Sequence, residues 1–315
     1  MKAIWENNTP YSKFLITVGI ILLSAVLFTL ISTIMATLIY GISMAELQVL
    51  VNDPSKPAAL SIFKIVQTVS ATGTFLVPPF ILAWLFSRDP MNYLSLKRTP
   101  MYYSAMVVIL IMLGVTPLIN FLGEINSQMH LPAFLKSVEV WMKQAEDRAG
   151  QLTDAFLKME TPGDFLFNIL MIGLLPAVGE ELVFRGIVQK LFQQWSKNTH
   201  VAIWSSAFIF SAMHMQFYGF IPRMALGGML GYMLAWSGSL WFPILGHFVN
   251  NAGAVVFMYL FQRGITDIDP DKIGTESDYA GVVFSLAVTV VLLFALYNRE
   301  KKLIGSRNPV AEELT

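Results

Sequence analysis

The sequence predicts an all-α protein, a polytopic membrane bundle of about eight transmembrane helices. Of its 315 residues, 55% are hydrophobic and only 13% are charged, whereas a soluble domain has about a quarter charged residues. The mean hydropathy is +0.59. Eight apolar runs approach or exceed the length of roughly 20 residues that a helix needs to cross a bilayer. They are residues 14–41, 59–87, 101–123, 165–190, 201–217, 221–238, 240–262 and 279–297.

The individual runs differ in how clearly they are bounded. The first follows MKAIWENNTPYSKF and lacks the short apolar core and small-residue cleavage site of a removable signal, so we expect a span; a cleaved signal is the alternative. Pro78 and Pro79 should kink the second run, where buried neighbours can satisfy the freed backbone groups. The fifth and sixth runs are short, and only residues 218–220 separate them.

The distribution of charge predicts the orientation of the chain. The loop at 267–278 is acidic, and residues 124–164 hold seven acidic residues against four basic ones. Basic residues lie instead before the first run, between the second and third runs, after the fourth and after the eighth. This distribution places both termini in the cytoplasm. Together with the short loops, this predicts an integral protein of a bacterial plasma membrane. The basic residues are Lys2, Lys13, Arg88, Lys97, Arg98, Lys190, Lys197, Arg299, Lys301, Lys302 and Arg307.

The connection between the third and fourth runs has a different pattern. Its apolar residues recur at helical spacing opposite a charged face, which predicts an amphipathic helix in the outer interface or capping the bundle. Simple packing and a part in substrate access are both open for it. No internal repeat or low-complexity linker divides the chain, so residues 1–315 are expected to form one integral membrane domain. The apolar residues are Phe134, Leu135, Val138, Trp141, Met142 and Ala145.

Composition excludes several classes of function. The formal net charge is zero, so there is no basic footprint for nucleic acid. The chain has no cysteine, which excludes disulfides, thiolate metal sites and a cysteine nucleophile. The apolar runs imply the lipid bilayer as a partner, and the sequence leaves the oligomeric state open.

Polar residues within the apolar runs are the candidates for chemistry, because an ionisable residue inside a span is costly. Glu181 and Arg185 are four apart in the order that favours a helical ion pair. Glu180 is turned about 100° away on the same helix, so it needs a different partner. Lys64, in the second run, has no evident partner and is interpreted as structural. Further candidates are His214, His247, Asn250 and Asn251.

The economical arrangement places Glu180, His214, His247 and Asn251 around one cavity, with His247 and Asn251 on a shared helix face. A carboxylate beside a confined water suits general-base hydrolysis, and imidazole and amide groups could stabilise an oxyanion. Alternatively, Glu180, His214 and His247 could hold a divalent metal such as zinc with an open water position. The sequence lacks HExxH, the most specific zinc-peptidase signature.

Other interpretations compete with a hydrolytic site. A lone intramembrane histidine is often a hydrogen-bonded packing residue, and Asn250 could simply bind a helix backbone. Buried Glu and His could also form the relay of a proton-coupled transporter. Against a transporter, no paired hydropathy repeats with interrupted helices occur. A non-catalytic membrane scaffold or immunity protein is the remaining alternative.

Three short motifs in separate runs carry a resemblance to a known family. They are EExxxR within GEELVFRG, FxxxH within FSAMH and HxxxN within HFVNN. In this order they resemble the CPBP (Abi) family of CAAX proteases and bacteriocin-processing enzymes, which includes the eukaryotic type II CAAX prenyl endopeptidase. The motif-bearing core covers residues 165–262. The motif residues are Glu180, Glu181, Arg185, Phe210, His214, His247 and Asn251.

The resemblance implies an intramembrane endopeptidase, a hydrolase with an eight-span helical fold. It implies that Glu180 activates the attacking water, that His214 assists or holds this water, and that His247 and Asn251 line the oxyanion site. Supporting roles follow for Glu181 and Arg185, which orient the fourth span, and for Phe210, which shapes the pocket. The family is commonly called metalloprotease. The mechanism in which Glu180 activates water needs no metal ligand, and we favour it, while zinc stays open as a cofactor. The resemblance also implies a peptide or lipidated protein as the substrate, and prenylated CAAX-type C-termini are one class of it.

Overall fold

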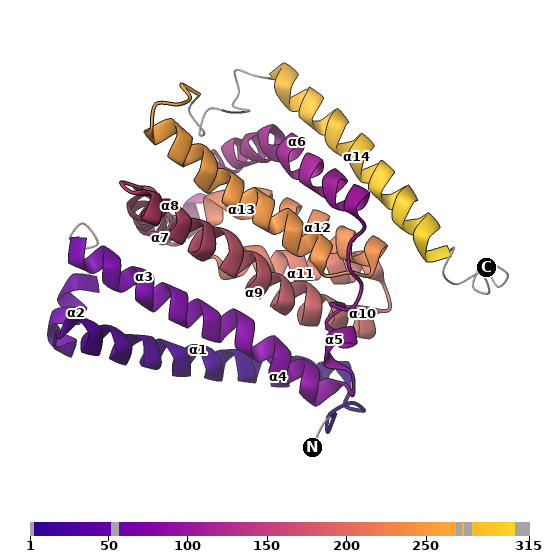
Figure 1. Ribbon diagram of the computed structural model, residues 1–315, viewed down its shortest axis with the longest axis horizontal. Helices are drawn as coiled ribbons and strands as arrows, with labels where there is room; N and C mark the ends of the chain where they lie inside the picture. The colour runs from indigo at the N-terminus through magenta and orange to yellow at the C-terminus, as the bar shows by residue number, and fades with distance from the viewer. Residues whose placement is uncertain (1–2, 52–56, 269–272, 274–278, 306–315) are drawn as a thin grey trace.

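The computed structural model describes residues 3–51, 57–268, 273 and 279–305, and all regular secondary structure in this part of the chain is helical. Figure 1 shows long helices running between the same two ends of a bundle. The predicted all-α fold is confirmed. The helices are α1 Pro10–Tyr40, α2 Met44–Val51, α3 Pro57–Ala71, α4 Val77–Phe86, α5 Pro90–Tyr93, α6 Tyr102–Ser127, α7 Lys136–Leu157, α8 Pro162–Asn168, α9 Leu175–Val183, α10 Gln189–Ser196, α11 Thr199–Met213, α12 Phe220–Ser237, α13 Trp241–Gln262 and α14 Tyr279–Gly305.

All eight predicted runs form helices, but they differ in length and hydropathy. Among the described residues, six helical stretches are long and apolar enough to cross a membrane. The fifth and sixth predicted runs correspond to α11 and α12, which are not among those six; α11 has only 15 residues. The six are Pro10–Tyr40, Ala59–Phe86, Tyr102–Ser127, Pro162–Ser196, Trp241–Gln262 and Tyr279–Leu303.

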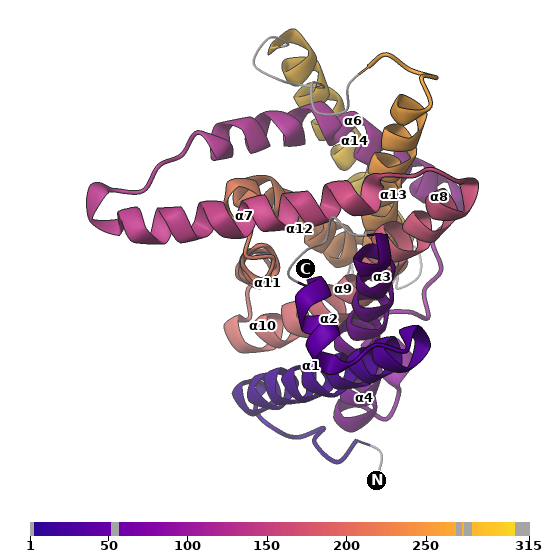
Figure 2. The same cartoon turned by 90° about the vertical axis from the view of Figure 1, so that its left-hand side faces the viewer.

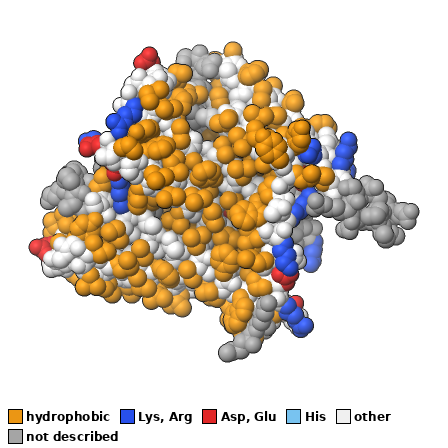
Figure 3. All heavy atoms as spheres, in the orientation of Figure 1, with side chains coloured by type: hydrophobic (Ala, Val, Ile, Leu, Met, Phe, Trp, Pro, Cys, Tyr) orange, Lys and Arg blue, Asp and Glu red, His pale blue; other side chains and the backbone are white. Residues whose placement is uncertain are grey.

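The outer helices have apolar residues outside and polar residues inside. On α1, Leu23 and Leu38 are 71% and 77% exposed, whereas Ser24 and Ser32 are buried. In water such an arrangement would expose apolar area and desolvate hydroxyls, but in lipid it places the apolar side chains against acyl chains. Figure 3 shows hydrophobic side chains covering most of one face, with many of the charged groups near its edges. The protein is an integral membrane protein.

A π-helical turn, Thr72–Leu76, precedes the Pro78–Pro79 pair in the second span. The Val77 N–H donates to the Thr72 carbonyl, and Pro78 has no N–H to give to Gly73. The Ser24 hydroxyl of α1 donates to the Gly73 carbonyl at 2.7 Å. The proline disturbance predicted here thus takes the form of a widened turn, and a neighbouring helix satisfies the freed carbonyl.

The predicted amphipathic helix is α7, which lies across one end of the bundle in Figure 2. The chain before its N-terminus is tied down by His130, whose Nδ1 lies 2.8 Å from Glu139 Oε1. Hydrogen bonds from His130 and then Lys136 hold the pKa of Glu139 below its usual value. At the other end, Asn168 donates to the Phe156 carbonyl at 2.6 Å. The helix is therefore fixed at both ends over the bundle.

The start of α1 and the end of α14 lie at the same end of the bundle, and α7 lies at the opposite end (Figure 1). This agrees with an even number of crossings. The acidic loop 267–278 lies almost entirely outside the described residues, as do Lys2, Arg307 and the rest of the tail from residue 306. Lys64 has a partner that the sequence did not reveal: its Nζ lies 3.4 Å from Asp164 Oδ1.

Candidate active site

The fourth span, Pro162–Ser196, carries a fully buried ion pair. Arg185 Nη1 lies 2.8 Å from Glu181 Oε1, and the two side chains are 1% and 0% exposed. The predicted i,i+4 pair is therefore confirmed. Arg185 also donates through Nη2 to the Gly227 carbonyl of α12 at 2.9 Å, and its guanidinium carbon lies 4.8 Å from the Phe210 ring centroid. The pair thus links the fourth span to both α11 and α12.

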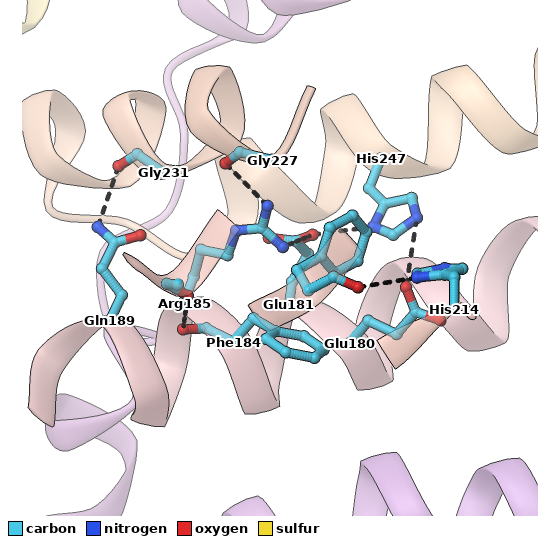
Figure 4. A network of polar contacts seen from close by, with 11 residues as sticks. Glu180, Glu181, Phe184, Arg185, Gln189, His214, Gly227, Gly231 and His247 are labelled. Atoms are coloured by element: carbon cyan, nitrogen blue, oxygen red, sulfur yellow. Dashed lines mark hydrogen bonds and ion pairs between the residues drawn. The ribbon is translucent and has the colours of Figure 1, made fainter. Parts of the chain in front are cut away.

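His247 of α13 contacts both glutamates of the motif (Figure 4). Its Nδ1 lies 2.8 Å from Glu181 Oε1, the oxygen that also accepts from Arg185. Since an ionised carboxylate can only accept, Nδ1 carries the proton, and the orientation of the ring is fixed. The other nitrogen, Nε2, faces Glu180.

Glu180 is the glutamate that meets the cavity. Its side chain is 14% exposed, and its Oε2 lies 3.9 Å from His247 Nε2. That separation is too long for a direct hydrogen bond but short enough for both atoms to contact one water molecule. Glu180 therefore points away from the Glu181–Arg185 ion pair, as its spacing on the helix predicts.

His214 lies at the C-terminal end of α11, where the helix stops. Its Nδ1 donates to the Phe210 carbonyl at 2.8 Å, so Nε2 is the nitrogen left for other contacts. The Phe210 ring packs edge-on against both imidazoles, with centroid distances of 5.0 Å to His214 and 6.1 Å to His247. Phe210 therefore spaces the two histidines, and in Figure 4 the Glu180 carboxylate points toward them.

Asn251 holds α13 against the fourth span. Its Nδ2 donates to the Ile172 carbonyl at 3.2 Å, and its Oδ1 accepts from Asn250 at 3.0 Å. Ile172 lies four residues before Pro176, which has no N–H to donate to that carbonyl. Asn251 therefore replaces a backbone donor, and one N–H of its amide remains for another acceptor.

These residues surround one cavity of about 470 Å³, within the size range of small-ligand sites. Glu180, His214, His247 and Asn251 all line it, together with Phe210. Glu181 and Arg185 do not line the cavity; they lie behind the residues that do. Part of the wall comes from α7, which contributes Ala149, Leu152, Thr153 and Phe156.

Two glycines of α12 allow the close packing behind the site. A Cβ on Gly227 would lie 3.3 Å from Arg185 Nη2, and one on Gly231 would lie 2.8 Å from Gln189 Oε1. Gln189 donates to the Gly231 carbonyl at 3.2 Å, in parallel with the bond from Arg185 to Gly227. Sequence reasoning did not single out these residues, although the GxxxG spacing of the two glycines was a signal for close helix contact.

Sequence reasoning also missed Arg223, which lines the cavity from the first turn of α12. Its guanidinium donates from Nη1 to the Gln216 carbonyl at 2.8 Å and from Nη2 to Gln216 Oε1 at 2.6 Å. Arg223 lies near the start of a predicted span, where basic residues are common, so its position in the sequence gave no signal of a role in the cavity.

The geometry gives no support to a metal centre. Among the described residues, no group of three or more His, Cys, Asp or Glu side chains is arranged to hold a metal ion. Glu180 and His247 approach each other, but His214 does not complete a three-ligand set with them.

Residues 162–253 match a protein family described as type II CAAX prenyl endopeptidase Rce1-like. The predicted resemblance is confirmed. The Rce1-like segment begins at α8 and ends within α13, and it contains the three motifs around the cavity. An uncharacterized protein, YpbD of Bacillus subtilis (strain 168), is 34% identical over 89 residues, which are 27% of this chain and 42% of YpbD. The match therefore covers less than half of that relative. No solved structure is significantly similar to this chain.

Proposed function

We propose that this protein is an intramembrane endopeptidase in which Glu180 activates a water molecule for attack on a peptide bond. The observation that carries the proposal is the approach of Glu180 Oε2 to His247 Nε2 at 3.9 Å, inside a cavity of a membrane-spanning bundle. A carboxylate and a positioned imidazole that can contact the same water form a general-base arrangement. The resemblance of residues 162–253 to an endopeptidase family supports the same chemistry.

The proposed reaction consumes one water molecule and releases an acid and an amine. Glu180 takes a proton from the water as the water oxygen bonds to the carbonyl carbon of the substrate. The resulting oxyanion accepts hydrogen bonds from the remaining amide N–H of Asn251 and from Nε2–H of protonated His247. Glu180 then returns the proton to the amide nitrogen as the C–N bond breaks. The catalytic groups end in their starting protonation states.

The residues behind the cavity hold this arrangement. Glu181 accepts from Nδ1–H of His247 and so turns Nε2 toward the cavity, as the carboxylate of a catalytic triad orients its histidine. Arg185 supplies the buried counter-charge of Glu181. His214, anchored through Nδ1 to the Phe210 carbonyl, presents Nε2 as a second contact for the water.

The substrate we propose is a peptide or lipidated protein, with prenylated CAAX-type C-termini as the first class to test. Apolar side chains of the cavity such as Leu226 and Leu230 suit such a substrate better than a polar one. We further propose one domain over residues 1–315 with its motif-bearing core at 165–262. The location proposed is a bacterial plasma membrane with both termini cytoplasmic. The shared end of α1 and α14 in Figure 1 supports this topology.

The test uses purified full-length protein in liposomes with quenched peptides that are farnesylated, geranylgeranylated or unmodified. Glu180→Gln should lower cleavage by about 100- to 10,000-fold with little change in the melting temperature. Glu160→Gln is the matched control, because that carboxylate is 74% exposed and outside the cavity. Undiminished cleavage by the Glu180 variant would contradict the mechanism. Proton flux that requires Glu180, with no cleavage of any peptide, would replace the proposal with a transporter.

A further inference from the structure

We propose that Arg223 selects substrates by binding a carboxylate of the peptide. This inference rests on the proposed function, because it assigns a specificity-determining residue to the same cavity. Arg223 shares the cavity with Glu180 and His247, so a ligand that reaches the catalytic groups also meets the guanidinium.

The guanidinium of Arg223 is held in one place. Nη1 and Nη2 donate to the backbone and side-chain oxygens of Gln216 at 2.8 and 2.6 Å. The group also lies against Gly219, where an added Cβ would be only 2.7 Å from Nη2. A planar donor fixed by its neighbours loses little conformational entropy when it binds a ligand.

Arg223 has no carboxylate as a direct partner. Both of its acceptors on Gln216 are neutral, and the described part of the chain places no Asp or Glu within ion-pair distance of it. Glu146 and Glu180 act on its charge only from beyond that distance. Other arginines have direct partners: Arg98 pairs with Glu300 at 2.9 Å, and Arg185 with Glu181 at 2.8 Å. A half-buried cation whose direct partners are neutral can bind a carboxylate that a ligand brings into the cavity.

Helix stability does not account for this arginine. Arg223 lies in the first turn of α12, where the positive end of the helix dipole disfavours a cation. Its replacement by a neutral side chain should therefore leave α12 intact, and a loss of binding in that variant can be read as a loss of recognition.

A carboxylate is the anion that a peptide substrate can bring. Two of the guanidinium N–H groups are used by Gln216, and the remaining ones can donate to carboxylate oxygens. Apolar side chains line much of the rest of the cavity, including Phe156, Met171 and Leu226, and they suit the uncharged residues of such a peptide. The carboxylate can come from a free C-terminus or from an acidic side chain near the scissile bond.

Binding to full-length Glu180→Gln protein in nanodiscs tests this without any cleavage. The probes are three dansyl-labelled farnesylated peptides: one with a free C-terminal carboxylate, its C-terminal amide, and the amide with glutamate as the last residue. Charge-assisted hydrogen bonds predict that the free acid binds about 10- to 100-fold more tightly than the plain amide. Recovery of affinity by the glutamate amide alone would assign recognition to a side-chain carboxylate.

Adding Arg223→Gln should remove this preference, Arg223→Lys should keep part of it, and Arg148→Gln, at an exposed position on α7, should keep all of it. Equal affinity for the three probes, a preference that survives Arg223→Gln, or no binding of any probe would overturn the proposal. In the protein with Glu180 present, Arg223→Gln should raise KM for the free acid with kcat little changed. If no peptide is cleaved, the proposed function fails while the binding result still decides the role of Arg223.

Discussion

His247 Nδ1 and Arg185 Nη1 both lie 2.8 Å from the same oxygen, Oε1 of Glu181. One buried carboxylate oxygen therefore receives donors from two directions, an imidazole on α13 and a guanidinium on its own span. Because Arg185 also bonds to the Gly227 carbonyl, three helices meet at Glu181. The buried Glu181 carboxylate thus joins the site to the packing of these three helices.

Breaking this buried pair on one side should cost more than removing it. Arg185→Met leaves the Glu181 carboxylate buried without its counter-charge, and we expect a loss of about 3–5 kcal/mol in the free energy of unfolding. Glu181→Gln with Arg185→Met should cost clearly less than the sum of the two single changes. Unfolding by denaturant in micelles measures the cycle. Additive effects would show that the two groups do not depend on each other in the fold.

The position of His247 between Glu181 and the cavity predicts that its imidazole is needed for cleavage. In the proposed reaction Nδ1–H donates to Glu181 while Nε2–H donates to the oxyanion. His247→Gln offers an amide donor that cannot make both contacts, so the rate should fall by about 100- to 1,000-fold. His200→Gln is the control, because His200 bonds to Tyr232 away from the cavity. An undiminished rate in the His247 variant would show that its imidazole does not stabilise the oxyanion.

Much of the candidate site could be predicted because it depends on spacing within one helix. The i,i+4 relation of Glu181 and Arg185 and the different direction of Glu180 follow from helical geometry alone. Contacts between helices depend on packing register, which the sequence does not encode in any short pattern. Glu181 was therefore assigned to Arg185 alone, and its bond to His247 emerged only in the structure. Lys64, interpreted without a partner, reaches Asp164, which lies far along the chain, for the same reason.

The π-helical turns are a second feature that could not be predicted in detail from the sequence. Proline in a span predicts a disturbance but not how the freed carbonyls find partners. Here Ser24 donates to the Gly73 carbonyl within the π turn Thr72–Leu76. Asn251 donates to the Ile172 carbonyl within a second π turn, Ile169–Leu174, in the fourth span. The sequence placed Asn251 at the cavity through its spacing from His247. Its second contact, to the Ile172 carbonyl, requires the position of α13 beside the fourth span.

The hydrogen bond from Asn251 to the Ile172 carbonyl predicts an energetic coupling between Asn251 and Pro176. Asn251→Ala should lower stability by about 1–3 kcal/mol, because the Ile172 carbonyl is left without a donor. In a Pro176→Ala background the new backbone N–H can satisfy that carbonyl, so the cost of Asn251→Ala should shrink. Thermal unfolding of the four proteins gives the coupling energy. Cleavage should stay low in both Asn251 variants, because the oxyanion donor is absent in each. If Asn251→Ala costs the same stability in both backgrounds, the Asn251 amide does not replace the backbone N–H that Pro176 lacks.

The glycines of α12 give the last prediction, and it separates packing from helix propensity. A Cβ on Gly231 would lie 2.8 Å from Gln189 Oε1 and 2.9 Å from Ile203 Cγ2. Both side chains are buried, and the branched Ile203 has little freedom to move. Gly231→Ala should therefore cost about 1–3 kcal/mol through overpacking, although alanine favours a helix by roughly 0.5–1 kcal/mol.

Gly253→Ala on α13 is the matched control, since its Cβ would have no atom within 4 Å. We expect it to be neutral or slightly stabilising. Cleavage should fall only in the Gly231 variant, because Gln189 and Arg185 bond to α12 from the same span and a shift there displaces Glu181 from His247. Denaturant unfolding and cleavage rates of the two variants, measured side by side, check both parts. Equal stability of the Gly231 and Gly253 variants would show that α12 can move away from the fourth span without cost.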